Sequence, residues 1–379
     1  MDHEFGDGRQ GKGKEAMPRE VVRQHLPLFE EQGRSASVPD EVGRNLHYLP
    51  DLPSEDPYQA GHRTCAGCGP AIQYRWVLKA AGQNTVVAGP TGCMYVANAT
   101  YMSTPYTVPW AHTQIASGGS FTSGMAAAYE SMIRKGKYEG EYPNILVMAG
   151  DGSAADIGIG SISGALYRNH DALFICYDNE CYANTGIQTS PTTPYGGSTT
   201  FTPPGKVIPE GKKLPPKNLA KMMSEGHPNC YVATTTVGYT IDLMNKTRKG
   251  LNHRGAAFLH CYTPCQKGWV YQTPMTVELG RRVVECGLFP VWEYDPASRR
   301  YDYFIPPEQR PVVDYLAMQG RFGHMHPEHV ALMQVAANRN WEDMGVDVPK
   351  RLRELEDPEA HQHLKKETYS LPVNRGIGA

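Results

Sequence analysis

The run Asn144-Ile-Leu-Val-Met-Ala-Gly150-Asp151-Gly152 is the stretch that decides how this chain folds. Its apolar part has the length of a short buried strand, and the glycines after it let the backbone turn sharply and approach a ligand closely. Asp151 then stands at the carboxyl edge of a sheet, where α/β folds bind their ligands. The run therefore predicts a strand, a tight turn and a binding site in one segment.

A second segment, Asp178-Asn179-Glu180, places Asn179 28 positions after Asp151. Asp151 supplies a carboxylate, Asn179 an amide oxygen, and the bend after it a main-chain carbonyl. Mg²⁺ demands oxygen ligands in a near-ideal octahedron, which diphosphate oxygens and a water would complete. The two segments predict a diphosphate site built around a divalent cation. The simpler alternative is that Asp151 is a turn residue that caps a helix.

Two other glycine patterns have simpler interpretations. Gly6-Asp7-Gly8 repeats the motif, but no strand precedes it, and it lies in a polar, charged leader that we interpret as solvated coil. Gly158-Ile-Gly160-Ser-Ile-Ser-Gly164 is similar to a dinucleotide fingerprint. It has one residue too many before the third glycine and falls inside a predicted helix, so it does not indicate nicotinamide binding.

Nine cysteines in a chain without a secretory signal favour metal or redox use over disulfides. Cys65-Ala-Gly-Cys68 is a closely spaced pair, whereas Cys93 and Cys265 follow far along the chain in Gly or Pro turns. Four thiolates so widely separated close one tetrahedral site only if the fold gathers them. Such a site suits zinc or a 4Fe–4S cluster, and the single CxxC alone favours zinc.

The motifs, taken in order, also resemble those of a known family. They are Cys65-Ala-Gly-Cys68-Gly, Thr91-Gly-Cys93, Val108-Pro-Trp110-Ala-His112, Gly150-Asp-Gly152 with Asp156-Ile-Gly158, Asp178-Asn-Glu180-Cys-Tyr-Ala-Asn184-Thr-Gly186-Ile-Gln188, Thr193-Pro194, and Tyr262-Thr-Pro-Cys265 with Gly268-Trp269. Together they resemble the β subunit of a 2-oxoacid:ferredoxin oxidoreductase, the pyruvate synthase family, which includes phenylglyoxylate-type members for aryl 2-oxoacids. The resemblance runs from about residue 60 to about residue 325. It implies thiamine diphosphate, Mg²⁺ and a 4Fe–4S cluster, with coenzyme A as co-substrate. The resemblance therefore favours the cluster over zinc at the four cysteines.

The resemblance also implies a role for each matching residue. The cluster ligands would be Cys65, Cys68, Cys93 and Cys265, and the magnesium ligands Asp151, Asn179 and the carbonyl of Cys181. Asn184 would face the thiazolium and the substrate. The remaining residues expected to line the cofactor are Gly92, Cys93, Gly150, Gly152, Ser153, Thr185 and Gly186. His112 is the second catalytic candidate, expected either to touch the diphosphate or substrate or to bond a backbone carbonyl.

Other cysteines and one departure from the family pattern qualify this assignment. Cys261 competes with Cys265 for the fourth cluster position, but Cys265 follows a proline and leads a turn, which favours it. Cys176 and Cys230 lie in or beside apolar strands, and we interpret them as buried small hydrophobes. Pro70 stands where some members of the family have a glutamate that engages the aminopyrimidine. The missing acid is expected from a partner, a pyrimidine-type α subunit.

The fold class expected is α/β, a doubly wound and mostly parallel sheet of the thiamine diphosphate-binding, pyrophosphate-type module, with extensions at both ends. Residues 1–60 form a polar arm, 61–295 the cofactor domain, and 296–379 an extension for packing or a subunit interface. The predicted strands are Thr85–Ala88, Asn144–Gly150, Leu173–Asp178, Tyr231–Thr236 and Ala256–Tyr262. The proline-rich stretch Thr189–Pro216 is predicted to be a functional loop. The extension holds the mixed segment Arg310–Phe322, an amphipathic helix over Glu328–Asn338 and a charged helix from Val348.

Composition limits the classes of partner. A formal net charge of −2 gives no electrostatic case for nucleic acid, and no apolar run approaches the ~18 residues of a membrane span. We expect a cytoplasmic chain in a heteromeric complex that passes electrons to ferredoxin or, through a flavin subunit, to NAD. The alternatives are a non-oxidative thiamine decarboxylase or synthase, which would not need the four cysteines, and a non-catalytic iron–sulfur or zinc subunit. The 2-oxoacid itself is not indicated by the sequence.

Overall fold

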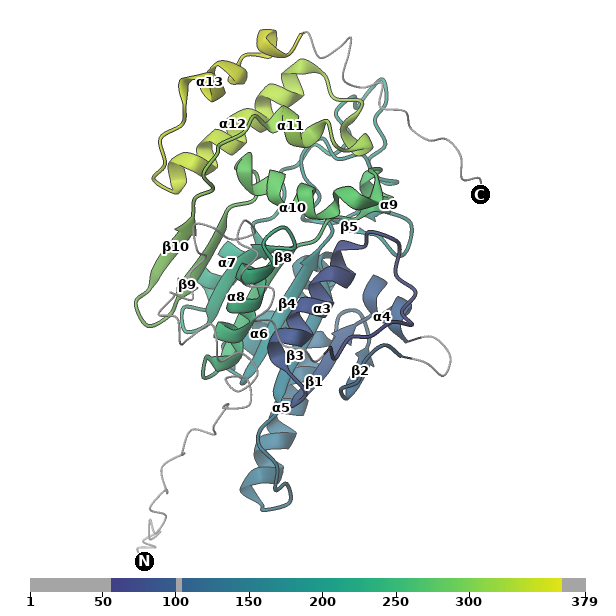
Figure 1. Cartoon of the computed structure of the whole chain (residues 1–379), viewed down its shortest axis with the longest axis vertical. Coiled ribbons are helices and arrows are strands. Elements are labelled where there is room, and N and C mark those ends of the chain that lie inside the picture. The colour runs from purple at the N-terminus through teal and green to yellow at the C-terminus, as the bar shows by residue number, and fades with distance from the viewer. Residues whose placement is uncertain (1–55, 100–103, 363–379) are drawn as a thin grey trace, which may run out of the picture.

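The computed structural model describes residues 56–99 and 104–362. Its centre is an eight-stranded sheet with the order β10-β9-β7-β8-β4-β3-β1-β2 (Figure 1). The strands are β1 (Thr85–Pro90), β2 (Trp110–Thr113), β3 (Asn144–Gly150), β4 (Ala172–Asp178), β7 (Tyr231–Thr236), β8 (Ala256–Tyr262), β9 (Val291–Asp295) and β10 (Arg300–Phe304). A separate two-stranded ribbon joins β5 (Cys181–Tyr182) to β6 (Gln188–Thr189).

Six neighbouring strands of the sheet are parallel, namely β2, β1, β3, β4, β8 and β7 in spatial order. The strands β9 and β10 add an antiparallel edge beside β7. Near-continuous apolar runs form the central strands because a parallel sheet covered by helices is buried on both faces. Successive side chains alternate between the faces. Leu146 and Met148 of β3 enter one core, and Ile145 and Val147 enter the other. The sheet is therefore doubly wound, as predicted.

Helices cover both faces of the sheet. The first core contains residues of α3 (Gly69–Ala81) and α8 (Thr240–Asn252), and the second contains residues of α5 (Gly118–Arg134), α6 (Ile159–Tyr167) and α7 (Leu219–Gly226) (Figure 1). The other α-helices are α4 (Cys93–Asn98), α9 (Gln266–Trp269), α10 (Thr276–Glu285), α11 (Val312–Leu316), α12 (Pro327–Asp343) and α13 (Lys350–Arg353). Short 3₁₀ or π turns are η2 (Ser153–Ile157), η3 (Thr273–Met275), η4 (Gly320–Phe322), η5 (Glu354–Glu356) and η6 (Pro358–His361).

The segment from α11 to η6, which we call the C-terminal cap, packs against the carboxyl edge of the sheet. Tyr315 and Phe322 of the cap share a third core with Tyr262 at the end of β8 and Trp269 in α9. This core is rich in aromatic side chains, which bury a large area each. The cap therefore lies directly beside the loops in which the sequence places the binding site.

All five predicted strands are present, and Asn144–Gly150, Tyr231–Thr236 and Ala256–Tyr262 have the predicted bounds. Strands β2, β9 and β10 of the main sheet, and the short β5 and β6, were not predicted from the sequence. β10 is part of the main sheet, so the sheet itself extends to Phe304, beyond the predicted domain boundary at residue 295. The amphipathic helix is confirmed as α12, whereas the charged helix from Val348 is only the short α13 followed by 3₁₀ turns.

Other expectations concern the ends and the loops of the chain. Residues 1–55 of the predicted polar arm, with the second Gly-Asp-Gly copy, lie outside the described residues. The stretch from residue 190 to 216 contains no helix or strand, which agrees with the predicted long loop. Among the described residues, no helix is both long and apolar enough to cross a membrane.

Candidate cofactor and metal site

Four loops meet at one edge of the sheet because the parallel strands β1, β3, β4 and β8 all end there. These loops carry Cys93, Asp151, Asn179 and Cys265, one after each strand. The chain reverses its winding direction between β1 and β3, and ligands of α/β folds bind at such a switch point. Residues that are more than 170 positions apart thus come together for a topological reason.

A small cavity of about 70 Å³ lies at this switch point. Its lining consists of Thr91, Gly92, Cys93, Ile115, Gly150, Asp151, Gly152, Ser153, Tyr177, Asn179, Cys181, Tyr182, Ala183, Asn184 and Thr185. The chain leaves β3 through Asp151 and Gly152 into the π turn η2 and then α6. π turns are frequent at functional sites, and main-chain N–H groups at such a strand-to-helix turn suit an anion.

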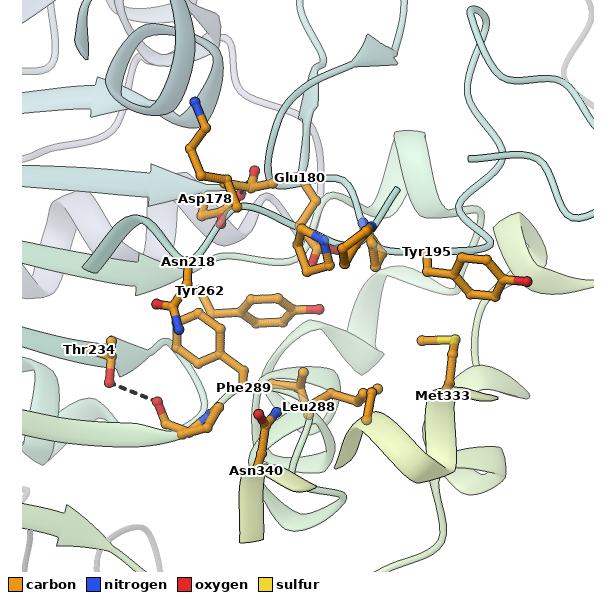
Figure 2. Close-up of a pocket in the computed structure, with 18 of the residues that line it drawn as sticks. Asp178, Glu180, Tyr195, Asn218, Thr234, Tyr262, Leu288, Phe289, Met333 and Asn340 are labelled. Carbon is orange, nitrogen blue, oxygen red and sulfur yellow. Dashed lines mark hydrogen bonds between the residues drawn. The ribbon is translucent and has the colours of Figure 1, made fainter. Parts of the chain in front are cut away.

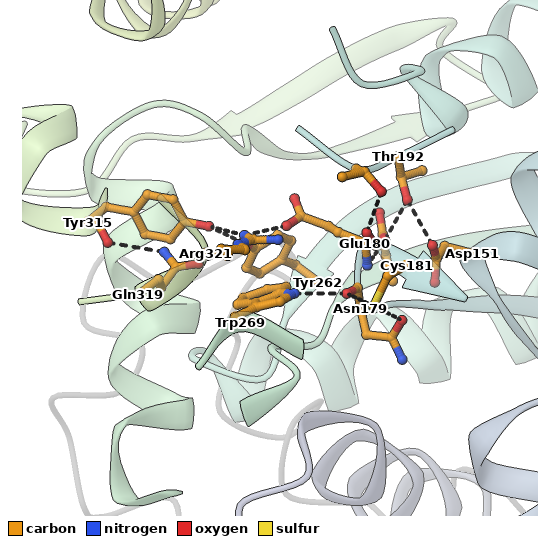
Figure 3. Close-up of polar contacts among 12 residues, drawn as sticks. Asp151, Asn179, Glu180, Cys181, Thr192, Tyr262, Trp269, Tyr315, Gln319 and Arg321 are labelled. Carbon is orange, nitrogen blue, oxygen red and sulfur yellow. Dashed lines mark hydrogen bonds and ion pairs between the residues drawn. The ribbon is translucent and has the colours of Figure 1, made fainter. Parts of the chain in front are cut away.

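Three oxygen atoms converge beside this cavity. The side-chain oxygen of Asn179 lies 3.0 Å from Asp151 Oδ1 and 2.7 Å from the Cys181 carbonyl oxygen (Figure 3). Two arrangements satisfy these atoms: the amide turns over and its nitrogen donates to both, or a cation sits among three oxygens. Cis ligands of an octahedral Mg²⁺ with bonds of roughly 2.1 Å stand about 3.0 Å apart. The distances of 3.0 and 2.7 Å from the Asn179 oxygen to the other two oxygens are close to this value and suit a magnesium ion.

The electrostatics of Asp151 also favour a cation. Its side chain is buried, and Thr192 Oγ1 donates to Asp151 Oδ2 at 3.1 Å and to Asp178 Oδ1 at 2.8 Å. Burial and, after it, the charge of Asp178 raise the pKa of Asp151 well above its ordinary value. His260 Nε2 lies 2.7 Å from Asp178 Oδ2 and holds that carboxylate. In the part of the chain that the structure describes, an ionised Asp151 has no equivalent partner, and a divalent cation would supply one.

Two glycines make room for aromatic rings around the cavity. A Cβ on Gly152 would lie 2.2 Å from the ring of Tyr182, whose hydroxyl donates to the Gly152 carbonyl at 3.0 Å. A Cβ on Gly92 would lie 2.4 Å from the hydroxyl of Tyr177. Close packing therefore requires glycine at both positions. Neither tyrosine was predicted from the sequence as part of the site.

The predicted catalytic residues lie toward solvent. Asn184 and Thr185 are exposed and line the mouth of the cavity, whereas Gly186 is exposed and outside its lining. His112 is also exposed and outside the lining, and its Nε2 lies 2.8 Å from Thr91 Oγ1, not from a backbone carbonyl. The side chain of Thr91, which lines the cavity, therefore lies between His112 and the cavity. Ser153 is buried and donates to the Ile115 carbonyl at 2.6 Å.

The Cys65–Cys68 loop joins the same edge from the start of α3. Gly69 N donates to the Pro264 carbonyl at 3.1 Å, and Thr276 Oγ1 donates to the Gly67 carbonyl at 2.6 Å. A Cβ on Gly69 would lie 2.5 Å from the Pro264 oxygen, so only glycine allows this approach. The CxxC loop is thereby fixed beside the loop that carries Cys265.

The four predicted cluster thiols influence one another. Burial, with smaller contributions from Cys265 and Cys65, raises the pKa of Cys68 to about 12. Burial also raises the pKa of Cys93, followed by the effects of Cys265, Cys68 and Cys65. Among residues 56–99 and 104–362, no three His, Cys, Asp or Glu side chains stand close enough to hold a single metal ion. A cluster places several irons and sulfides between its thiolates, so it suits a wider set of thiols than zinc does.

The remaining cysteines lie elsewhere. Cys261 is fully buried in the first core, and the groups that raise its pKa after burial are Asp242 and Asp178, not the other thiols. Cys176 and Cys230 are buried in the second core, as predicted. Cys181 is the exception, because the neighbouring Cys265 and, after it, burial raise the pKa of its thiol well above the ordinary value.

The C-terminal cap contributes a buried cation that the sequence analysis missed. Arg321 Nη2 pairs with Glu180 Oε2 at 2.6 Å, and its guanidinium carbon lies 3.8 Å from the centre of the Trp269 ring (Figure 3). Trp269 Nε1 in turn donates to the Asn179 carbonyl at 3.0 Å. The cap thus holds the backbone of a predicted magnesium ligand. Glu180 and Trp269 lie inside quoted motifs, but no sequence pattern points to Arg321.

A second cavity of about 490 Å³ lies between the cap and the ends of β4, β7 and β8 (Figure 2). Its walls are mainly apolar, with Tyr195, Phe289 and Met333 among them. Asp178 and Glu180 reach this cavity, whereas Asn179 and Cys181 reach the small one. The segment 178–181, which bends at Glu180 (φ +58°), therefore separates the two cavities.

Comparison with known proteins gives four findings. Residues 90–261 match the family model of the thiamine pyrophosphate enzyme, C-terminal TPP binding domain. The pyruvate synthase subunit PorB of Methanocaldococcus jannaschii is 41% identical over 284 residues, which cover 75% of this chain and 94% of that protein. The ketoisovalerate oxidoreductase subunit VorB of Pyrococcus abyssi is 37% identical over 308 residues, 80% of this chain and 96% of that protein. Among solved structures, 2-oxoglutarate:ferredoxin oxidoreductase from Magnetococcus marinus aligns with a TM-score of 0.45 and 16% identity, over 80% of this chain and 96% of that one.

Proposed function

This chain belongs to the β-subunit family of 2-oxoacid:ferredoxin oxidoreductases, and from that premise we propose that the edge of its sheet holds thiamine diphosphate, Mg²⁺ and a 4Fe–4S cluster. The enzyme of which it is a subunit decarboxylates a 2-oxoacid oxidatively in a reaction that depends on coenzyme A. The non-oxidative and non-catalytic alternatives do not agree with relatives of 41% and 37% identity that align over nearly their whole length.

The observation that carries the cofactor proposal is the triangle of oxygens from Asp151, Asn179 and Cys181. It lies beside the glycine-lined cavity, so a metal held there would meet the diphosphate. When bound, thiamine diphosphate supplies the carbon nucleophile and the electron sink for decarboxylation. Asp151 would neutralise the metal, Asn179 and the Cys181 carbonyl would fix its position, and the buried hydroxyl of Thr192 keeps Asp151 oriented.

The cluster proposal rests on four thiols that the fold gathers from three loops. Cys65, Cys68, Cys93 and Cys265 would hold the cluster, which accepts electrons one at a time. Cys93 also lines the cofactor cavity, so the two groups would be neighbours. A reducing cytoplasmic location, which we propose for this chain, keeps such thiols available.

The shape of the site supports a shared active site. The cavity is small, and Asn184, Thr185 and His112 face outward around its mouth. Pro70, at the position of the family's glutamate, is buried in the first turn of α3 and offers no acid. We therefore assign the aminopyrimidine half of the cofactor, and the acid that engages it, to a pyrimidine-type α subunit.

The substrate class and the acceptor are narrower proposals. Relatives of this chain are named for pyruvate and for ketoisovalerate, which indicates a small or branched 2-oxoacid. About a quarter of the chain has no counterpart in the pyruvate synthase subunit, which leaves an aryl acid such as phenylglyoxylate as the second candidate. The same extra length is compatible with a larger complex that delivers electrons to NAD through a flavin subunit instead of ferredoxin.

Analysis of the anaerobically purified complex tests the cofactor set. We expect about four irons with sulfide per chain, as Cys₄ ligation implies, together with thiamine diphosphate and magnesium. Serine in place of Cys65, Cys68, Cys93 or Cys265 should remove the iron, whereas serine in place of Cys176, Cys230 or Cys286 should leave it. Stoichiometric zinc without sulfide would overturn the cluster assignment. Rates with pyruvate, 3-methyl-2-oxobutanoate and phenylglyoxylate would then decide the substrate.

A further inference from the structure

Tyr177 carries a buried hydroxyl inside the small cavity. It is the penultimate residue of β4, its side chain is only 1% exposed, and its hydroxyl oxygen has no hydrogen-bond partner among residues 56–99 and 104–362. Polar groups buried in proteins are nearly always hydrogen-bonded, because an unpaired group has given up its contacts with water. The exception at Tyr177 therefore points to a ligand of the cavity that this residue lines.

The other hydroxyls around the cavity already have acceptors. Ser153 and Tyr182 donate to main-chain carbonyls at 2.6 and 3.0 Å, and Thr91 and Thr185 also donate to neighbouring oxygens. Among the described residues that line the cavity, Tyr177 alone has a buried side-chain polar atom without a partner. Its hydroxyl is thus the one that has a hydrogen to give to a ligand.

The Tyr177 hydroxyl lies between the two glycine turns that line the cavity. A Cβ on Gly92, after β1, would lie 2.4 Å from its oxygen, and a Cβ on Gly150, at the end of β3, would lie 3.2 Å from it. Gly92 has an extended backbone with a φ of 173°, so its conformation does not require glycine. The space that the hydroxyl occupies does require it, and the turn is therefore shaped around this group.

The ring of Tyr177 is held in place by its neighbours. Tyr74 of α3 packs edge-on against it with the ring centres 5.8 Å apart, and the Tyr74 hydroxyl donates to the Met148 carbonyl of β3 at 3.2 Å. Tyr177 itself lies opposite Gly150 in the pairing of β3 with β4. A donor that is fixed before its ligand arrives loses little conformational entropy on binding.

We propose that Tyr177 is a binding residue for the cofactor and that its hydroxyl donates a hydrogen bond to the diphosphate. This role rests on the proposed cofactor set. The diphosphate is the anionic part of thiamine diphosphate, whereas the thiazolium is a cation and the aminopyrimidine is assigned to the partner subunit. Hydrogen bonds to charged acceptors are the stronger ones. Tyr177 would thus add a side-chain donor to the main-chain N–H groups of the glycine turns.

Calorimetric titration of the purified complex, stripped of thiamine diphosphate and supplied with Mg²⁺, tests this role. The ligands are inorganic diphosphate and thiamine diphosphate. Tyr177→Phe removes only the hydroxyl, and both ligands should bind roughly 10- to 100-fold more weakly, as for the loss of a hydrogen bond to a charged group. Without cofactor, the variant should unfold at a temperature no lower than the wild type, because the described residues offer the hydroxyl no partner.

Tyr95→Phe is the matched control. Tyr95 also has a fully buried hydroxyl without a partner in the described part of the chain, and it also packs edge-on against Tyr74, with the ring centres 6.3 Å apart. It lies in α4 and does not line the small cavity. The control removes the same atom from the same aromatic group, and both affinities should stay at wild-type values.

The possible results separate this inference from the proposed function. Unchanged affinities in Tyr177→Phe, or equal losses in Tyr177→Phe and Tyr95→Phe, would overturn the role of the hydroxyl and leave the cofactor assignment intact. Weaker binding of thiamine diphosphate with unchanged binding of inorganic diphosphate would overturn it as well. So would a cofactor-free Tyr177→Phe complex that unfolds at a lower temperature, because the hydroxyl would then serve the fold. A wild-type complex that binds neither ligand would instead overturn the proposed function.

Discussion

The two cavities on either side of the segment 178–181 differ in size and in the partners of their carboxylates. The small cavity is lined by glycines and by oxygen atoms that face one another, and its buried Asp151 has no cationic partner among residues 56–99 and 104–362. The large cavity is mainly apolar, and its two carboxylates are already paired, Asp178 with His260 and Glu180 with Arg321. The segment 178–181 therefore separates a site with an unpaired buried carboxylate from a space in which both carboxylates have partners. The difference teaches that unpaired charge, more than volume, identifies the cofactor site.

Replacing Asp151 by alanine should have the largest effect on cofactor binding at the small cavity. Without the carboxylate, the metal and the diphosphate lose their charge compensation, and thiamine diphosphate should be absent from the purified complex. Asp151→Asn should lose most of it too if a cation occupies the triangle, whereas a mere hydrogen-bond network would tolerate the amide. Chelation of the wild-type complex with EDTA should release the cofactor in the same way.

The measurement is the thiamine content of the complex after desalting, with Asp302→Ala as control, because Asp302 is an exposed carboxylate on the edge strand β10. Retention of the full cofactor content by Asp151→Ala would remove the contrast between the cavities and place the metal elsewhere.

Gly152→Ala should have the next largest effect. The new Cβ would meet the Tyr182 ring at 2.2 Å, so the ring must swing away and lose its hydrogen bonds to the Gly152 carbonyl and to Asp156. Overpacking typically costs about 1–3 kcal/mol, and 1.4 kcal/mol is a tenfold change in affinity. Titration of the metal-loaded complex with thiamine diphosphate should therefore show binding weaker by about tenfold or more.

Gly160→Ala is the matched control, because no atom lies within 4 Å of a Cβ at that position in α6. It should leave thiamine binding unchanged and stabilise the helix slightly, by roughly 0.5–1 kcal/mol. Removal of the ring in Gly152→Ala/Tyr182→Ala should restore part of the affinity. Equal binding by the two single glycine variants would show that close packing at Gly152 is unimportant.

Arg321→Met should weaken the segment 178–181 from the side of the large cavity. It leaves Glu180 buried without its partner, and breaking a buried pair costs roughly 3–5 kcal/mol. Burial raises the pKa of Glu180 to about 7, so uptake of a proton by this carboxyl would reduce the cost. Trp269 and the Asn179 carbonyl that it holds should loosen as well, and thiamine content should fall, though less than in the variants above.

Thermal unfolding and cofactor content measure this effect. Arg310→Met is the control, because Arg310 forms partly exposed ion pairs with Glu285 and Glu308, whose loss should cost at most about 1 kcal/mol. Addition of Glu180→Gln to Arg321→Met should recover stability, since no buried carboxylate is then left alone. Equal stability of Arg321→Met and Arg310→Met would contradict the role of the buried pair.

These residues also show how far the sequence alone reaches. The small cavity was predicted in most of its parts, because Asp151 and Asn179 follow apolar runs that end at the same edge of a parallel sheet. The pairing of Arg321 with Glu180 was not, since the two residues lie in separate elements 141 positions apart and only tertiary packing brings them together. β9 and β10 were missed for a local reason. Their alternation of aromatic and charged residues is typical of an exposed edge hairpin and not of the buried runs used to find the other strands.

Ala336→Leu should have the smallest effect. Ala336 lies on α12 at the open side of the large cavity, so the larger side chain fills apolar space without contact to Asp151, Asn179 or Cys181. Stability should change by no more than roughly 0.5 kcal/mol, as for most exposed substitutions, and thiamine content, cluster potential and rate should stay at wild-type values. Loss of thiamine in this variant would mean that the segment 178–181 transmits changes from one cavity to the other. In that case Asp178 and Glu180 would couple the two spaces through Thr192 and Asn179, and the large cavity would have to be regarded as part of the active site.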